Sequence, residues 1–198
     1  MQSSGPEQSG TLYRLSCQSG TWEDLDADSG GDPCDACSLA LGTVCTSDGA
    51  VYAGTTVGGA RMYVADADET ANGGRYKYGG YGTDLNGDDA SVAPELHADG
   101  LANTNWLLTN GTGDHDAAQV CRDRGPDWYL PAIEELGDIY ANRAQLGAAN
   151  LPTSASWYLS SSEYTGVQTQ SARVQRFSDG VQASGSKNNI LLVRCVRR

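Results

Sequence analysis

The sequence predicts an α+β fold with short twisted antiparallel strands, two helices and long Gly-rich loops. Two segments of the last third predict it. Residues 130–147 have the spacing of an amphipathic helix, and residues 190–196 (ILLVRCV) form a short apolar run typical of a buried strand. The composition agrees, because 25 Gly and 10 Tyr but a single Phe favour turns and short strands over long helices.

The predicted helix within residues 130–147 follows the dipeptide Trp128-Tyr129 and begins around Leu130. We expect Pro131 in its first turn, where a missing backbone N–H is tolerated. Apolar residues then recur at steps of three or four, as on one helix face: Ile133, Leu136, Ile139 and Tyr140. Gly147 is its predicted end.

The segment between this helix and the terminal strand has strand-like ends and a permissive middle. Residues 157–160 and 172–177 favour strands, whereas the residues around them are small or polar. A rigid frame that brackets such a stretch is typical of a binding surface.

The first half of the chain predicts hairpins. The Ser19–Gly20 pair would close a short one, and residues 38–68 predict three strands joined by turns at Asp48–Gly49 and Gly58–Gly59. We therefore expect residues 1–42 to be a leader with a cysteine-rich hairpin for assembly. Residues 43–198 form the predicted main domain, with an insertion at residues 69–99.

A second helix is predicted around the apolar residues Ala117, Val120 and Cys121. Asp114 or Asp116 can cap its start, and a Gly-Pro pair ends it. Residues 99–113 are expected to lead into this helix without forming one.

The formal net charge of −12 argues against nucleic acid or an anionic membrane as the partner. A solvated acidic surface and a cation-binding surface both fit that charge. No apolar run approaches the roughly 18 residues of a membrane span, so no membrane insertion is expected. The N-terminal MQSSGPEQSG is polar and lacks the apolar core of a secretory signal.

The six cysteines form an early cluster of four and a separate late pair, Cys121 and Cys195. Extracellular disulfides are the first interpretation. We expect the early four to pair among themselves in one of three connectivities: Cys17, Cys34, Cys37 and Cys45. A zinc site from the same four, or a redox centre at Cys34-x-x-Cys37, are the alternatives.

The insertion contains a pattern that resembles a calcium loop. The predicted metal ligands occupy positions 1, 3, 5 and 12 of that pattern: Asp84, Asn86, Asp88 and Glu95. Asp89 stands where the turn requires Gly, and no helices are predicted beside it. These two departures favour a plain acidic turn, and calcium is the candidate cofactor of the alternative interpretation.

Three elements occur in a defined order: a helix with Cys121, a helix after Trp-Tyr-Leu-Pro, and a terminal strand with Cys195. Together they resemble the C-type-lectin-like fold, and the resemblance implies a disulfide between Cys121 and Cys195. The motifs DWYLPAIEEL, WYLSSSEY, Phe177-x-x-Gly180 and VRCVRR are similar to the C-terminal domain of collagen-like bacterial adhesins, over residues 43–198. Such a bond would leave residues 165–189 displayed on a rigid frame.

The last part of the chain is also similar to the variable region of proteins targeted by diversity-generating retroelements. In those proteins fixed residues hold the fold, while adenine-directed mutagenesis rewrites the positions between them. The matching fixed positions are Tyr158, Ser160, Ser161, Ser162, Glu163, Ala172, Phe177, Gly180, Gln182, Lys187, Val193, Arg194 and Cys195. The intervening positions are residues 165–171, 173–176, 178, 181, 183–186 and 188–192.

These resemblances imply a non-enzymatic ligand-binding or adhesion module on a phage particle or cell-surface appendage. Its partner would be a host-surface protein or a glycan, since the calcium-dependent sugar triplets Glu-Pro-Asn, Gln-Pro-Asp and Trp-Asn-Asp do not occur. The predicted contact residues are Tyr164, Gln168, Gln170, Arg173, Gln175, Arg176, Ser184 and Asn188.

Two other functions were weighed. A structural pilin-like or fibre subunit, self-assembling through its N-terminal segment into a fibre or homo-oligomer, is the alternative. An enzyme is not expected, because the chain has two His and no Gly-x-Ser-x-Gly or His-Glu-x-x-His motif. Glu134 and Glu135 fall on different sides of the predicted helix, and Glu135 is expected to be exposed with Asp138.

Overall fold

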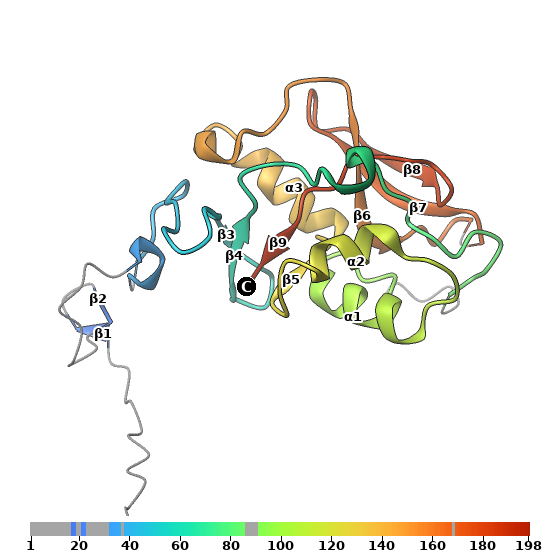
Figure 1. The fold of residues 1–198 in the computed structure, drawn as a ribbon, viewed down its shortest axis with the longest axis horizontal. Coiled ribbons are helices and arrows are strands. Elements are labelled where there is room, and N and C mark those ends of the chain that lie inside the picture. The colour runs from blue at the N-terminus through green and yellow to red at the C-terminus, as the bar shows by residue number, and fades with distance from the viewer. Residues whose placement is uncertain (1–16, 19–20, 23–31, 37, 86–90, 168) are drawn as a thin grey trace, which may run out of the picture.

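The computed structural model describes residues 17–18, 21–22, 32–36, 38–85, 91–167 and 169–198. Within them the chain is mixed α+β, which confirms the predicted class (Figure 1). One antiparallel sheet contains, in spatial order, β3 (Val51–Thr55), β4 (Arg61–Val64), β9 (Val196–Arg197) and β5 (Trp128–Tyr129). The other contains β6 (Trp157–Glu163), β7 (Ser171–Arg176) and β8 (Gln182–Ser186).

The predicted hairpins are present in shortened form. β1 (Cys17–Gln18) pairs with β2 (Thr21–Trp22), and β3 pairs with β4 across the Gly58–Gly59 turn. The third strand expected before β3 is reduced to one bridge, between Val44 and Val51. Short 3-10 helices complete this framework at Pro33–Asp35, Ala71–Gly74 and Gly147–Ala149.

The structure has three helices in its described residues, so the prediction of two was wrong. They are α1 (Gly100–Asn110), α2 (Asp116–Arg122) and α3 (Ile133–Ala141). The sequence did not reveal α1, because three of its four buried residues are not apolar: Gly100, Asn103 and Thr104, beside Leu107. None of the described helices is long and apolar enough to cross a membrane.

Helix α3 has the predicted buried face but different ends. Ile133, Leu136 and Ile139 are buried as expected. The helix begins two residues after Pro131 and ends at Ala141, so Gly147 is not its end but the first residue of a 3-10 turn. α3 contacts both sheets and fills the space between them (Figure 1).

Glu135 is buried, contrary to the expectation that it would be exposed. Its carboxylate accepts hydrogen bonds from the backbone N–H of Gly100 at 3.2 Å and of Ala132 at 2.8 Å, and from the Tyr129 hydroxyl at 3.1 Å. Arg198 lies 3.4 Å from the same carboxylate. Burial raises the pKa of Glu135, although the hydrogen bonds and the Arg198 charge act to lower it. One carboxylate therefore joins α1, β5, α3 and the chain end.

The C-terminal segment is less regular than the single strand predicted for residues 190–196. Leu191 and Leu192 make isolated bridges to Tyr76 and Tyr158, and regular pairing resumes only in β9. Ile190 is 54% exposed. β9 lies between β4 and β5 in the sheet, so the end of the chain is inserted into the middle of the first sheet (Figure 1).

The disulfide implied by the resemblance is present. Cys121 of α2 is bonded to Cys195, with their Cα atoms 5.3 Å apart and a sequence separation of 74. Both residues are fully buried. The bond fastens the segment before β9 to α2.

A second disulfide joins Cys34 to Cys45. It excludes a zinc site or redox pair that uses either of these sulfurs. Cys37 and the side chain of Cys17 lie outside the described residues, so the rest of the early pairing stays a prediction. The predicted domain boundary between residues 42 and 43 falls inside the loop that this bond closes.

Residues 32–36 are held against the first sheet by hydrogen bonds from a side chain of β4. Arg61 of β4 donates to the carbonyls of Cys34 at 3.0 Å and Ala36 at 2.7 Å. Burial acts to raise the pKa of Asp32, but hydrogen bonds from Ser47 and nearby backbone amides lower it to about 2.

Arg194 is the largest fully buried side chain of the described residues. Its guanidinium donates to Asp68 at 2.7 Å, to the Ala65 carbonyl at 2.9 Å and to the Ala149 carbonyl. Asp68 also accepts a hydrogen bond of 2.7 Å from the Tyr158 hydroxyl. The side chain therefore ties the segment after β4, the loop before β6 and β6 itself to the chain end.

Replacing both cysteines of the long bridge by alanine (C121A/C195A) should lower the free energy of unfolding by about 4 kcal/mol, because the bond closes a long loop. The matched C34A/C45A variant closes a much shorter loop and should lose about 3 kcal/mol. Urea denaturation measures both. A larger loss in the free energy of unfolding for C34A/C45A than for C121A/C195A would contradict this prediction.

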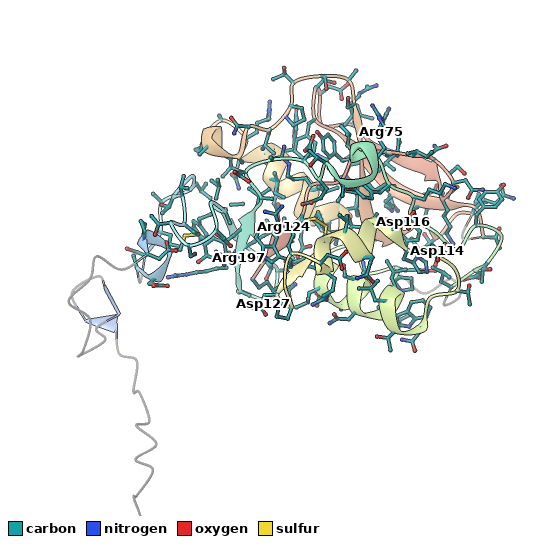
Figure 2. All side chains as sticks on the ribbon, viewed as in Figure 1. Arg75, Asp114, Asp116, Arg124, Asp127 and Arg197 are labelled. Atoms are coloured by element: carbon teal, nitrogen blue, oxygen red, sulfur yellow. A yellow bond between two sulfur atoms is a disulfide. The ribbon has the colours of Figure 1, made fainter. Side chains whose placement is uncertain are left out.

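Arg194→Met should lower the free energy of unfolding by about 3 kcal/mol, since it leaves carbonyl groups and Asp68 without their donor. Arg75 is exposed (Figure 2), and Arg75→Met should change stability by less than about 0.5 kcal/mol. Equal denaturation midpoints for the two variants would show that the Arg194 contacts carry no stability.

Candidate ligand-binding surface

Strand β6 is the internal support of the candidate surface. Residues 158–163 are all buried, because the strand is covered on both faces. The Ser160 hydroxyl donates to the Arg173 carbonyl at 2.9 Å, and the Ser162 hydroxyl donates to the Leu96 carbonyl at 2.7 Å. The Ser161 carbonyl accepts from the Tyr78 hydroxyl at 3.1 Å. Small hydroxylated side chains let neighbouring backbones approach β6 and satisfy their polar groups.

Strands β7 and β8 carry the surface outward from β6. Ala172 and Val174 of β7 belong to the same buried cluster as Leu159 of β6. β8 forms the outer edge of the sheet, and its residues are exposed or half-exposed. The sheet therefore changes from fully buried at β6 to solvent-facing at β8 (Figure 1).

The fixed and the intervening positions predicted from the resemblance differ in burial. All of the positions expected to be fixed are buried, except Gly180 and Gln182. Gly180 has φ +77°, and an added Cβ would lie 2.3 Å from the Tyr140 ring, so the position requires glycine. Among the described intervening positions, all are exposed or half-exposed except Val174 and Gln175.

Three of the predicted contact residues lie together. Arg173 is directly opposite Ser184 in the β7–β8 register, which places their side chains on one face. The Arg173 guanidinium lies 5.1 Å from the centroid of the Tyr164 ring. These three residues are called the display cluster below.

The other exposed contact residues lie at the two ends of the sheet. Gln170 and Asn188 are close in the fold, because the Lys187 N–H donates to the Gln170 carbonyl at 2.8 Å. Arg176 lies at the opposite end of β7, where it pairs with Asp179 and stacks on Trp157 at 4.9 Å. Gln168 lies outside the described residues.

Gln175 is not a surface residue, which corrects its assignment as a contact residue. It is 1% exposed, and its amide oxygen accepts a hydrogen bond of 2.9 Å from Gln182. The same Gln182 nitrogen donates to the Ile133 carbonyl at 3.0 Å. This pair joins β7 and β8 to α3 instead of facing a ligand.

A surface hollow of about 370 Å³ lies between the β3–β4 turn, the segment before α1, the start of α3 and the chain end. It is lined by Val57, Gly58, Leu96, His97, Ala98, Asp99, Glu134 and Arg198. Burial lowers the pKa of His97, and the positive charge of Arg173 lowers it further. The negative charge of Glu134 acts in the opposite direction. Sequence spacing could not predict this hollow, because its lining comes from four separate parts of the chain. The Glu134 N–H, which donates to the His97 carbonyl, joins two of them.

The predicted calcium residues are partly brought together. Carboxylate oxygens of Asp84 and Glu95 lie within 4.8 Å of each other and of an oxygen of Glu163. Asn86 and Asp88 lie outside the described residues. Sequence spacing could not include Glu163, which is supplied by β6 from a distant part of the chain.

A second hollow of about 400 Å³ lies between residues 32–48 and the β5–β9 edge of the first sheet. Arg124, Asp127 and Arg197 lie together there, whereas Asp114 and Asp116 lie apart at the start of α2 (Figure 2). Arg197 pairs with Asp48 at 2.7 Å and Arg124 with Glu69 at 2.8 Å. These arginines therefore already have carboxylate partners.

No known protein-family model matches this chain. No curated protein matches its sequence at a significant level. The lectin-like resemblance thus remains a prediction from the residues. The described residues show a mixed α+β fold with two disulfides among them.

Gln175→Ala should lower the free energy of unfolding by about 1 to 2 kcal/mol, because it removes a buried hydrogen bond and leaves a small cavity. Gln170→Ala is the matched control at an exposed position of the same strand region, and should change stability by less than about 0.5 kcal/mol. Chemical denaturation measures both. A neutral Gln175→Ala variant would contradict the buried role.

Proposed function

We propose that this protein is a non-enzymatic ligand-binding or adhesion module with a disulfide-clasped scaffold of the C-type-lectin-like kind. It presents a variable polar surface at the exposed positions of residues 158–192, which begin after the buried residues 158–163. The observation that supports this most directly is the division of burial within β6–β8. Positions expected to be constant are in the interior, except Gly180 and Gln182, while positions expected to vary face solvent, except Val174 and Gln175.

This division separates folding from binding. The Ser160 and Ser162 hydroxyls of β6 bond to carbonyls within the protein, and β7 packs apolar side chains inward, so the exposed positions can change without removing a core contact. Exposed substitutions away from caps and buried networks usually alter stability by less than about 0.5 kcal/mol. A scaffold of this kind tolerates many surface chemistries, as antibody loops do.

The display cluster has the chemistry of a recognition surface. Tyr164 offers a rigid aromatic ring, and Arg173, held over that ring, offers a preoriented guanidinium. Ser184, with Asn188 and Gln170 beyond it, adds small neutral hydrogen-bonding groups. Both a host-surface protein and a glycan present partners for these groups. The two disulfides fit an extracellular setting, on a cell-surface appendage or phage particle.

The experiment is a binding screen of the purified protein against immobilised glycans and host-surface proteins. Once a ligand is found, the triple variant Y164A/R173A/S184A should lower its affinity at least tenfold, because aromatic and arginine side chains dominate binding surfaces. Its melting temperature should stay close to that of the parent protein. Unchanged affinity in this variant would refute the assigned surface.

Self-assembly as a structural fibre subunit is the second candidate. The observation that favours it is the outer edge of β8, which pairs with no other strand among the described residues and carries no charged side chain. Such an edge can pair with another chain. Light scattering of the purified protein distinguishes the two functions, since a fibre subunit forms large assemblies and a recognition module does not.

A further inference from the structure

Two buried carboxylates meet where the insertion crosses the end of β6. Glu95 and Glu163 are both fully buried. The Glu163 N–H donates to the Pro94 carbonyl at 2.9 Å, which brings the segment around Glu95 against the end of β6. Asp84, from the other end of the same loop, adds a third carboxylate on the solvent side.

Lys187 places one positive charge beside Glu163. It is fully buried, forms an ion pair with one oxygen of Glu163, and donates to the Thr83 carbonyl at 2.8 Å. Carboxylates that are kept away from water are costly unless positive charge lies beside them. A cation bound between the carboxylates would add such charge.

Glu163 supplies an independent observation that points to a ligand. Its first carboxylate oxygen is occupied by Lys187, whereas its second, Oε2, is buried and has no hydrogen-bond donor among the described residues. Buried carboxylate oxygens normally have a partner. An ion placed between the carboxylates would provide it.

The geometry suits a hard cation. One oxygen of each of Asp84, Glu95 and Glu163 lies within 4.8 Å of the others. Ca²⁺ binds oxygen ligands at roughly 2.3–2.6 Å, so oxygens around one ion are up to about 5 Å apart. The cluster contains no nitrogen or sulfur ligand, which argues against zinc and related metals.

We propose that Asp84, Glu95 and Glu163 form a binding site for a divalent cation of the Ca²⁺ class. Water completes the coordination from the exposed side of Asp84. The site shares Asp84 and Glu95 with the calcium-loop pattern of the sequence, but β6 provides its third protein ligand. Glu163 directly precedes Tyr164 of the display cluster, but the cation site does not depend on what that cluster binds.

The ion joins the insertion to the sheet of β6, β7 and β8. Gly82, close to Asp84, donates to the Thr169 carbonyl at 2.6 Å in the β6–β7 connection. Lys187, beside Glu163, follows β8 directly. Ion binding at this point stabilises the contact between the two segments, and the folded state gains stability by mass action.

The test is calorimetric titration of the EGTA-stripped protein with CaCl₂, together with its melting temperature. We expect saturable binding of one ion and a rise in melting temperature of several degrees. MgCl₂ should give a smaller response, because Mg²⁺ demands a stricter octahedral geometry. An absent calcium response, or one equalled by Mg²⁺, would overturn the proposal.

Two variants and one control locate the site. Asp84→Asn changes an exposed group, so the protein should keep its melting temperature in EGTA while its calcium affinity falls at least tenfold. Glu163→Gln should abolish the calcium response. Asp116→Asn, at an exposed acid outside the cluster, should bind calcium as the parent does. Unchanged calcium affinity in Asp84→Asn would place the ion elsewhere. These measurements need no ligand, so their failure is separate from failure of the binding screen.

Discussion

The attachment of the chain end to the interior is the constraint on which the rest of the structure depends. Within three consecutive residues, Arg194 binds Asp68 and two carbonyls, Cys195 is bonded to Cys121, and Val196 pairs with both β4 and β5. Chain ends ordinarily fray unless they are tied down. Here these residues join α2, the segment after β4 and the first sheet, so they close the core instead of lying at its edge.

This attachment leaves β6–β8 free to serve as a surface. β6 is held by serine hydroxyls, by the Tyr158–Asp68 hydrogen bond and by the Glu163–Lys187 ion pair, all inside the protein. β7 contributes apolar residues inward and Arg173 outward, and β8 forms the outer edge. Stability is therefore concentrated in parts of the sheet that a ligand does not touch, and the exposed side chains can differ in chemistry without loss of the fold.

Buried polar groups are the feature that sequence reasoning handled least well. Glu135 looked like a solvated helix residue, yet it accepts hydrogen bonds from three elements. Gln175 looked like a contact residue, yet Gln182 holds it in the interior. α1 was missed because Asn103 and Thr104 are on its buried face, with Asn103 donating to the Leu96 carbonyl at 2.6 Å. In each case the partner lies on another element.

The sequence by itself determined the α+β class, the buried face of α3, the β3–β4 hairpin and the strands at residues 157–160 and 172–177. These follow from periodicity and turn residues, which report apolar burial and local conformation within a few positions. Only the tertiary structure decided that β9 inserts between β4 and β5, that Glu163 joins Asp84 and Glu95, and that Gln175 is buried. Those outcomes depend on partners that are distant in sequence. A polar side chain enters the interior only where the fold brings it a hydrogen-bonding partner, and local sequence carries no record of that partner.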